Sequence, residues 1–356
     1  MGRTTKLRPV STDRTQASAP AGRRVPGRRR RRIAWAALVV CGLVVLTAGG
    51  YLVYLNQIVS NNVRQDDLLP SPTAKVTNST GGVTTVTAPP RSEAASAPLN
   101  MLILGTDSRD HANRGRSDVI LLAHINGDRS AVTLIHFPRD LYVGIPGHGK
   151  NKINAAYAYG GVKLLVLTLQ QLIHVPIDHV AIVDFNGFKQ LTDAIGGVDV
   201  RVAEASPGFP AGVMHMDGKT GLKFVRTRYR LSQGDISRGR RQQAFVKAVL
   251  LKGLSKEVLL NPIKLASFID AGTSNLTVDQ SLDVATMRAL AFSLRNVRGN
   301  DISFITAPWK GIGTSRGGIS IVVPSKKQMA VLSRALRTDS LQDYDDPVSP
   351  THGFSR

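Results

Sequence analysis

Cysteine is almost absent from this chain, because Cys41 is the one cysteine among 356 residues. A single thiol excludes a disulfide framework, and it excludes zinc and iron–sulfur sites built from several cysteines. The P-loop, G-x-G-x-x-G and H-E-x-x-H motifs are absent too, and the eight histidines are scattered without a ligand-spaced pair. These absences argue against the common nucleotide-binding and zinc-dependent enzyme classes.

Acidic residues are few compared with basic ones. Lys and Arg number 46 against 25 Asp and Glu, for a net charge of +21. Residues 1–32 carry +10 of this charge, from eleven Lys/Arg and one Asp. A basic chain invites a nucleic-acid interpretation, but the arginines directly before an apolar segment are better explained by that position. The hydrophobic fraction of 42% supports a real core, and the length allows one large domain with appendages or two domains.

Residues 33–55 form a run of 23 residues without charge or proline. A helix of this length crosses a bilayer of about 30 Å, and the aromatic residues Trp35, Tyr51 and Tyr54 near its ends suit the two interfaces. The basic residues 1–32 predict a cytoplasmic N-terminus and an extracytoplasmic location for everything after the run, in a single-pass protein of the cell membrane. A cleaved signal peptide is the alternative, but the run is long for one and no A-x-A site directly follows it, which favours an uncleaved anchor.

Composition divides the remainder into three segments. Residues 56–97, rich in Ser, Thr and Pro, predict an extracytoplasmic linker, and residues 336–356 predict a flexible tail. Residues 98–335 alternate β-branched runs with helical stretches, which predicts a layered α/β domain with a covered sheet. Strands are expected at 101–104, 119–122, 132–135, 180–183, 198–202, 302–305 and 319–323, and helices at 161–173, 187–195, 238–258 and 280–295.

Two aspartates lie near the first two predicted strands. Asp107 follows the first strand, and Asp118 directly precedes the second. Active sites of α/β sheets gather at strand ends, so these carboxylates are candidate ligands for a hard cation such as Mg²⁺. Ordinary turn chemistry is the alternative for each aspartate taken alone.

A cluster of arginines follows later in the chain. If residues 224–230 are extended, Arg226, Arg228 and Arg230 share one face, with neighbours about 7 Å apart. Three like charges there repel one another unless an anion lies against them. A solvated surface is the alternative.

The helix expected after Asp235, a plausible N-cap, combines charge with apolar surface. Arg238, Arg241, Gln242 and Phe245 have the spacing of one helix face, which continues to Val249. Phosphate binds well at a helix N-terminus, and arginine suits phosphate oxygens. This face therefore fits a ligand with a phosphate head and a hydrocarbon tail. An amphipathic helix with its charged end in water is the alternative.

Seven motifs occur here in one order, and together they resemble the LytR-CpsA-Psr family of cell-envelope phosphotransferases. The likeness is close over roughly residues 98–258 and looser to about 335, and the Arg- and Ala-rich composition points to an actinobacterial member. The motifs are Gly105-Thr-Asp-Ser-Arg109, Arg116-Ser-Asp118, Pro138-Arg-Asp140, Lys152-Ile-Asn154, Asp193-Ala-Ile-Gly-Gly-Val-Asp-Val200, Arg226-Thr-Arg228 and Asp235-x-x-Arg-x-x-Arg-Gln-Gln243.

The resemblance implies an α-β-α domain with a central mixed sheet and a hydrophobic pocket for a lipid. It implies transfer of a glycopolymer from a polyprenyl-pyrophosphate carrier to a peptidoglycan hydroxyl, which forms a phosphodiester in cell wall assembly. It also implies Mg²⁺, with Mn²⁺ as a substitute, bound by Asp107 and Asp118. Beside these aspartates, the catalytic residues implied are Arg139, Arg226 and Arg228, and the residues implied at the pyrophosphate are Arg109, Arg116, Lys152, Arg226, Arg228, Arg238 and Gln242.

Several points stay open at this stage. Asp107 or Asp118 is the candidate general base, and metal ligation would lower the basicity of either one. His136 stands where many relatives have serine, and we interpret it as a packing residue or a support for the site.

The composition favours arabinogalactan as the polymer, with teichoic acid and capsule as the other options. The alternative functions are a pyrophosphatase acting on the same lipid and a non-catalytic envelope protein that binds anionic polymer. DNA binding is disfavoured by the predicted topology.

Overall fold

The computed structural model describes residues 28–78, 80–91, 96–106, 117–227, 230–232 and 235–345. The chain forms two units, Met1–Val53 and Tyr54–Arg356. In the first unit, the described residues belong to helix α1 (Arg28–Asn62), which continues into the second unit. The stretch Trp35–Asn62 is long and apolar enough to cross a membrane, so the apolar run predicted at 33–55 is helical.

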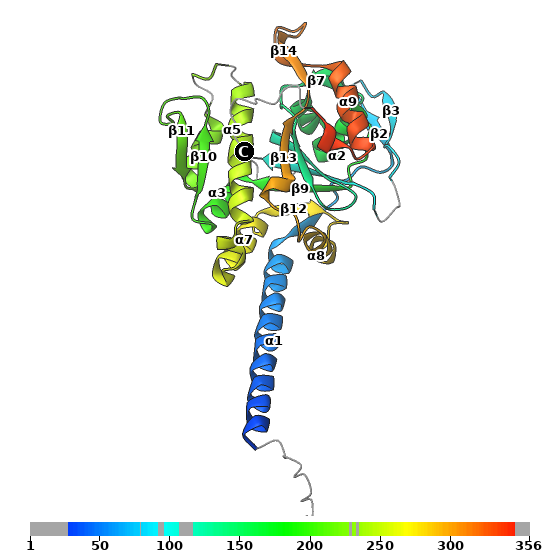
Figure 1. Cartoon of the computed structure of the whole chain (residues 1–356). Helices are drawn as coiled ribbons and strands as arrows, with labels where there is room; N and C mark the ends of the chain where they lie inside the picture. Colours follow the sequence, from blue (N-terminus) through cyan, green and yellow to red (C-terminus); the bar gives the residue numbers. More distant parts are fainter. Residues whose placement is uncertain are drawn as a thin grey trace, which may run out of the picture. The chain divides into compact units, whose positions relative to one another are not determined.

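The second unit is built around a seven-stranded mixed sheet (Figure 1). We call it the catalytic unit, after the activity that the sequence resemblance implies. Its strand order is β1-β12-β9-β4-β5-β6-β13. Parallel pairs are β1/β12, β9/β4 and β6/β13, and the other neighbouring pairs are antiparallel. This confirms the mixed α/β fold. The strands are β1 (Arg64–Asp66), β4 (Leu99–Thr106), β5 (Ser117–Ile125), β6 (Val132–His136), β9 (His179–Asp184), β12 (Leu276–Asp279) and β13 (Ile302–Thr306).

Alternation along the central strands sends side chains to two different environments, because successive residues of a strand point to opposite faces. In β4, Leu102 and Leu104 are fully buried in the main core, and in β5, Ile120 and Leu122 join them. This core packs against helices α2 (Ile153–Ile173) and α9 (Lys326–Arg337). The opposite face of the same strands carries the cavity described below.

A second core lies on the other side of the sheet (Figure 1). Phe209, Phe224 and Phe245 are almost completely buried there. The elements around it are α3 (Phe185–Ala194), β10 (Val198–Val202), β11 (Gly212–Met216), α4 (Gly218–Arg226) and α5 (Asp235–Gly253). The remaining elements are β2 (Thr73–Thr77), β3 (Val83–Thr87), β7 (Tyr142–Ile145), β8 (Gly149–Lys152), α6 (Lys256–Leu259), α7 (Pro262–Thr273), α8 (Val284–Ser293), η1 (Gly299–Asp301), β14 (Trp309–Thr314), β15 (Ser320–Pro324) and η2 (Leu341–Asp343).

The segment expected as a linker contributes to the catalytic unit. Strand β1 extends the main sheet beside β12, and β2 and β3 form a hairpin. Leu68, Val76 and Val86 from this region are buried in the main core. These strands were not predicted because a Ser/Thr/Pro-rich composition is typical of a linker, although Thr also favours strands.

The expected C-terminal tail is folded as far as the structure describes it, to residue 345. Leu341 is buried in the main core. Asp339 accepts hydrogen bonds from the backbone N–H of Gly127 (2.8 Å) and contacts His124 Nε2 at 2.9 Å. The part of the prediction that covers residues 346–356 lies outside the described residues.

Candidate active site

A cavity of about 820 Å³ lies between the sheet and helices α3, α4 and α5. From the sheet it receives the side chains that alternate with the main core, among them Ile103, Leu121 and Leu134. Most of the wall is apolar. The residues that line it are Ile103, Leu104, Gly105, Val119, Leu121, Ala123, Val132, Leu134, Val183, Asp184, Phe188, Leu191, Val225, Arg226, Arg238, Gln242, Val246, Val249, Leu250, Leu254, Leu294, Val297 and Ile302.

Two arginines and an amide occupy one end of this cavity. Arg226 is the last residue of α4, whereas Arg238 and Gln242 lie one turn apart near the start of α5. Arg238 is only 3% exposed, and Arg226 is exposed. The Nε2 of Gln242 lies 3.4 Å from the carbonyl oxygen of Val225, which links the two helices. This end therefore presents positive charge and an amide to a ligand inside the cavity.

Helix α5 changes from polar to apolar along the cavity wall, as predicted, but the face differs from the predicted one. Below Arg238 and Gln242, the wall continues with Val246, Val249 and Leu250. Arg238 and Leu250 are separated by about 18 Å of helix at 1.5 Å per residue. The polar and apolar ends of the cavity are thus far apart.

Arg241 and Phe245, which were predicted on the cavity face, belong to the second core instead. The guanidinium of Arg241 lies over the rings of Phe224 and Phe209, at 4.8 and 5.7 Å from their centroids. It donates hydrogen bonds to the carbonyl oxygen of Glu204 (2.7 Å) and to Ser206 Oγ (2.9 Å). Arg241 therefore stabilises the second core. The prediction treated Arg238, Arg241, Gln242 and Phe245 as one helix face, whereas the structure divides them between two neighbouring faces of α5.

The extended conformation considered for residues 224–230 is not found at the start of this segment, where the structure describes a helix. Residues up to Arg226 form α4, which begins after Asp217, whose carboxylate accepts a hydrogen bond from the N–H of Thr220 (2.7 Å). This N-cap, together with the burial of Phe224 and Val225, favours the helix. Arg226 therefore lies at the end of a helix and not on a strand face.

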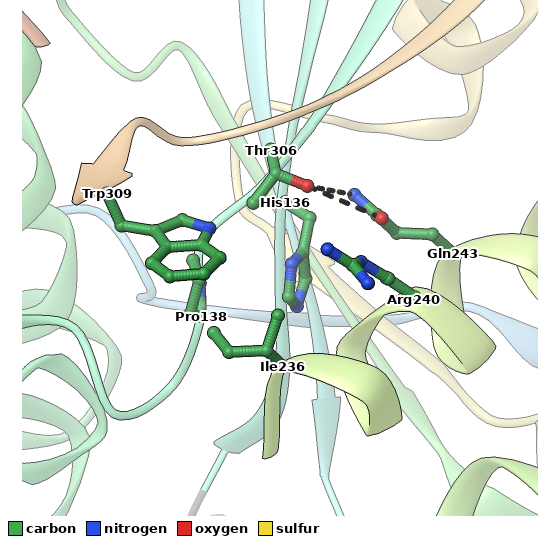
Figure 2. A pocket seen from close by; sticks show the side chains of 7 residues that line it. All are labelled: His136, Pro138, Ile236, Arg240, Gln243, Thr306 and Trp309. Atoms are coloured by element: carbon green, nitrogen blue, oxygen red, sulfur yellow. Dashed lines mark hydrogen bonds between the residues drawn. The ribbon is translucent and has the colours of Figure 1, made fainter. Parts of the chain in front are cut away.

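His136 lies behind the arginine end, in a second and much smaller cavity of about 10 Å³, room for about one water molecule. Figure 2 shows the residues around it: Pro138, Ile236, Arg240, Gln243, Thr306 and Trp309. Gln243 Nε2 donates hydrogen bonds to Thr306 Oγ1 (3.1 Å) and to the carbonyl oxygen of Ile305 (3.2 Å). Burial and then the charge of Arg238 lower the pKa of His136 to about 4. The imidazole is therefore neutral near pH 7.

The backbone of α5 touches the His136 ring closely. A Cβ at Gly239 would lie 2.7 Å from His136 Cε1, closer than atoms pack, so glycine allows this approach. Since Gly239 directly follows Arg238, the ring supports the turn that carries the buried arginine. This agrees with the interpretation of His136 as a packing residue.

Arg139 and Lys152 were predicted at the pyrophosphate, but neither side chain lines the large cavity. Arg139 follows β6, and its carbonyl oxygen accepts a hydrogen bond from the N–H of Asn154 (3.2 Å). Lys152 Nζ forms an ion pair with Asp140 Oδ1 at 3.1 Å. Neither is among the described residues that line the cavity. A contact of either residue with a pyrophosphate stays a prediction.

The side chains of the other predicted site residues lie outside the described part of the chain. Asp107, Arg109, Arg116 and Arg228 lie outside the described residues, and of Asp118 only the backbone in β5 is described. Among the described residues, no group of three or more His, Cys, Asp or Glu side chains could hold a metal ion.

Asp184 is a cavity residue that the sequence reasoning missed. It ends β9 and is the N-cap of α3, and its Oδ1 accepts a hydrogen bond from the N–H of Gly187 (2.7 Å). In the sheet it pairs with Thr106, the residue before Asp107. An acidic residue between a buried strand and a predicted helix was the signal that could have identified it.

Comparison with known proteins decides the family. Residues 65–338 match the sequence profile of the LytR_cpsA_psr family, which is more than half of the chain. The chain belongs to the LytR-CpsA-Psr family. It is similar to the Bacillus cereus protein named polyisoprenyl-teichoic acid–peptidoglycan teichoic acid transferase TagU, with 37% identity over 195 residues, 53% of this chain and 64% of that protein.

Two further comparisons extend over more of the LytR-CpsA-Psr unit. The Bacillus anthracis protein of the same name is 31% identical over 261 residues, 72% of this chain and 82% of that protein. The crystal structure of Bacillus subtilis TagV matches with a TM-score of 0.58 and 24% identity, over 71% of this chain and all of that one. The structural match supports the LytR-CpsA-Psr fold.

Proposed function

We propose that this protein is a membrane-anchored phosphotransferase that moves a glycopolymer from a polyprenyl-pyrophosphate carrier onto a peptidoglycan hydroxyl. The observation that carries the proposal is the cavity of about 820 Å³, with apolar walls and two arginines at one end. The names of the relatives, transferases of teichoic acid to peptidoglycan, support transfer over simple hydrolysis.

The shape of the cavity suits the carrier lipid. Valine and leucine side chains from β5, β6 and α5 would contact an isoprenoid chain, since burying apolar surface stabilises such a complex by roughly 25 cal/mol per Å². Arg226, Arg238 and Gln242 would then contact the pyrophosphate at the other end. Arginine binds phosphate oxygens in a bidentate manner, and a buried guanidinium such as Arg238 does so in a medium of low dielectric.

Mg²⁺ is proposed where β4 ends and β5 begins, beside this end of the cavity. The pairing of β4 with β5 joins Gly105 to Val119 and Thr106 to Ser117. Asp118 is the β5 residue between those partners, and Asp107 directly follows Thr106 in the chain. Two carboxylates attached to neighbouring strand ends are a donor set suited to Mg²⁺. The ion, when bound, would neutralise part of the pyrophosphate charge.

The proposed reaction is a displacement at phosphorus. The acceptor oxygen bonds to the phosphorus that carries the glycan, the bond from this phosphorus to the bridging oxygen breaks, and polyprenyl phosphate leaves. The hydroxyl proton passes to Asp107 or Asp118, the two candidate bases. Arg226 and Arg238 stabilise the charge that develops on the leaving group, which is the main contribution a protein makes to phosphoryl transfer.

The proposed topology has an N-terminus in the cytoplasm and the catalytic unit outside the membrane. It is supported by the basic residues before the apolar run and by the length of α1. As the polymer we propose arabinogalactan on composition, whereas the relatives are named for teichoic acid. Mass spectrometry of the lipid that co-purifies with the protein identifies the donor.

The function is tested with lipid-linked donor and a glycan acceptor. We expect Arg226→Ala to abolish formation of the glycan phosphodiester while the protein keeps its melting temperature. Release of free glycosyl phosphate without phosphodiester would instead indicate a pyrophosphatase. Unchanged transfer by the variant would contradict the proposed site.

A further inference from the structure

We propose that the end of the catalytic unit formed by α6, α7 and α8 docks onto the lipid bilayer, so that a carrier lipid passes from the membrane directly into the cavity. The docking itself rests on surface chemistry. The delivery of lipid rests also on the function proposed above. Figure 1 shows α7 and α8 at one end of the catalytic unit.

Three large apolar side chains stand in solvent at this end. Leu260 is 77% exposed, Ile263 is 79% exposed and Phe292 is 67% exposed. We call these three residues the apolar patch. Leu260 and Ile263 lie at the start of α7, and Phe292 lies near the end of α8. Large apolar side chains this exposed at one end of a protein mark partner or membrane surfaces.

The backbone holds part of the patch in place. Asn261, between Leu260 and Pro262, is the N-cap of α7, and its Oδ1 accepts hydrogen bonds from Ile263 (3.0 Å) and Lys264 (3.1 Å). Glu257 pairs with both Lys252 and Lys264, which ties the end of α5 to the start of α7. Leu260 and Ile263 are thus held outward by an ordered corner.

The chain that leads from the membrane-spanning stretch attaches to the same helices. Asn62, at the end of α1, donates hydrogen bonds to Asp270 Oδ1 (2.8 Å) and Thr273 Oγ1 (3.1 Å), at the end of α7. Arg288 of α8 donates to Asn56 Oδ1 (3.2 Å). Asn56 is the first residue after the apolar run. The helices that carry the patch are therefore the ones joined to the membrane anchor.

Basic residues are close in sequence to the residues of the apolar patch. Lys256 lies in α6, while Arg295 and Arg298 follow α8, and all three are exposed. The guanidinium of Arg295 lies 4.3 Å from the centre of the Phe292 ring. Exposed apolar side chains with basic neighbours are the combination that binds the interface of an anionic bilayer.

The apolar end of the cavity borders this surface. Leu254, just after α5, lines the cavity and is 36% exposed. Leu294 and Val297, which follow Phe292, line it too. A Cβ at Gly299 would lie 2.5 Å from Leu251 Cδ2, so the segment after α8 packs against the end of α5. A lipid tail in the bilayer would meet the cavity at its apolar end, with the arginines at the far end.

Docking is tested by fluorescence of the full chain in vesicles of phosphatidylglycerol and phosphatidylcholine. Cys41 is replaced by Ala, and a polarity-sensitive fluorophore is attached in turn at Ile263→Cys and Phe292→Cys. The matched control is Val331→Cys on α9, which is 53% exposed and distant from α7 and α8 in Figure 1. We expect lipids with a nitroxide on the acyl chain to quench the two patch positions at least twofold more than the control.

Equal quenching at all three positions would overturn the docking. A blue shift at the patch without quenching by the lipid nitroxide would also overturn it, because a second copy of the chain or another protein would then cover these residues. The fluorescence measurement does not depend on transfer of glycopolymer, so it still tests the docking if the proposed activity is wrong.

Delivery is tested by kinetics of the double variant Leu260→Ser, Ile263→Ser. We expect transfer from a long-chain donor embedded in vesicles to fall about tenfold, while transfer from a short, water-soluble isoprenoid donor stays unchanged. Val331→Ser is the control and should change neither. Loss with both donors, or with neither, would overturn the delivery role. If the unsubstituted chain transfers neither donor, the proposed function fails and the fluorescence result stands alone.

Discussion

Two effects lower the pKa of His136 in the folded protein. Burial disfavours the charged imidazolium, and the neighbouring guanidinium of Arg238 repels it. The ring that supports the turn of Arg238 is therefore neutral when the arginine is charged. A protonated ring would place a second positive charge beside that of Arg238.

Stability should therefore depend on pH through His136. Its pKa is lowered in the folded protein from 6.5 to about 4, so below pH 6.5 the unfolded chain binds a proton that the folded chain does not. The contribution of the neutral His136 to the free energy of unfolding is therefore fully present above pH 6.5 and is lost as the pH falls toward 4. From pH 7 to pH 5 we expect a loss of about 2 kcal/mol.

The measurement is thermal unfolding of the full chain in detergent at pH 7 and pH 5. His136→Gln should lose less stability over this interval than the unsubstituted protein. The exposed residue His215 provides the control variant, His215→Gln. An equal pH dependence for the His136 variant and the unsubstituted protein would contradict this assignment.

Arg238 and Arg241 are neighbouring arginines of one helix with different roles. We expect Arg238→Lys to lower transfer tenfold or more with little change in melting temperature, because lysine lacks the bidentate geometry for a pyrophosphate. Arg241→Lys should instead destabilise the fold by about 2 kcal/mol, through loss of the ring contacts and of the hydrogen bonds near Glu204. Transfer rates and unfolding midpoints of both variants distinguish the roles. The reverse pattern would show that the wrong arginine was assigned to the cavity.

The sequence predicted part of the site at this scale. Arg238 and Gln242 were found because their spacing and their motif pointed to the same helix, and Arg226 was found from its motif. Asp184 was missed because a single acidic residue at a strand end carries no motif. The proposed role of the Asp107 and Asp118 side chains as metal ligands stays a prediction.

At the scale of elements, α4 shows why local composition misleads. A run of alternating arginines has the period of a strand, but α4 ends within that run and is determined by residues before it, from the Asp217 cap to the buried Phe224. Helix α5 was easier to predict, because it is long and its apolar face is continuous. The helices expected at 161–173, 187–195 and 280–295 overlap α2, α3 and α8, whereas α7 and α9 were not predicted.

The cavity wall formed by α5 gives an element-scale prediction. Val246 lies on this wall between Gln242 and Leu250. We expect Val246→Trp to lower the amount of co-purifying lipid severalfold, because the indole would occupy space in the cavity, while the open volume limits the strain of the larger side chain. Lipid extracted per mole of protein is measured by mass spectrometry. Val331→Trp on α9 is the matched control, and equal lipid content in the two variants would contradict a lipid-binding cavity.

Over the whole molecule, strands β4, β5, β6, β9 and β13 of the main sheet were predicted, whereas β1 and β12, at one edge of that sheet, were not. Central strands such as β4 and β9 have buried apolar side chains, and their sequences show it. Strand β1 has three exposed residues and is held by its pairing with β12, which a local pattern does not reveal. The partners of β1 lie more than 200 residues further along the chain.

This difference makes the domain boundary a testable prediction. A chain that begins at residue 98, where composition places the domain, lacks β1 and the buried residues Leu68, Val76 and Val86. Burial of three such side chains contributes about 5 kcal/mol or more, which is comparable to the whole stability of many domains.

We therefore expect residues 98–345 to aggregate or to unfold without cooperativity. A chain of residues 54–345, which keeps the hairpin and β1, should unfold in a single transition. Circular dichroism during thermal unfolding compares the two, and equal midpoints would show that the predicted linker does not contribute to the fold's stability.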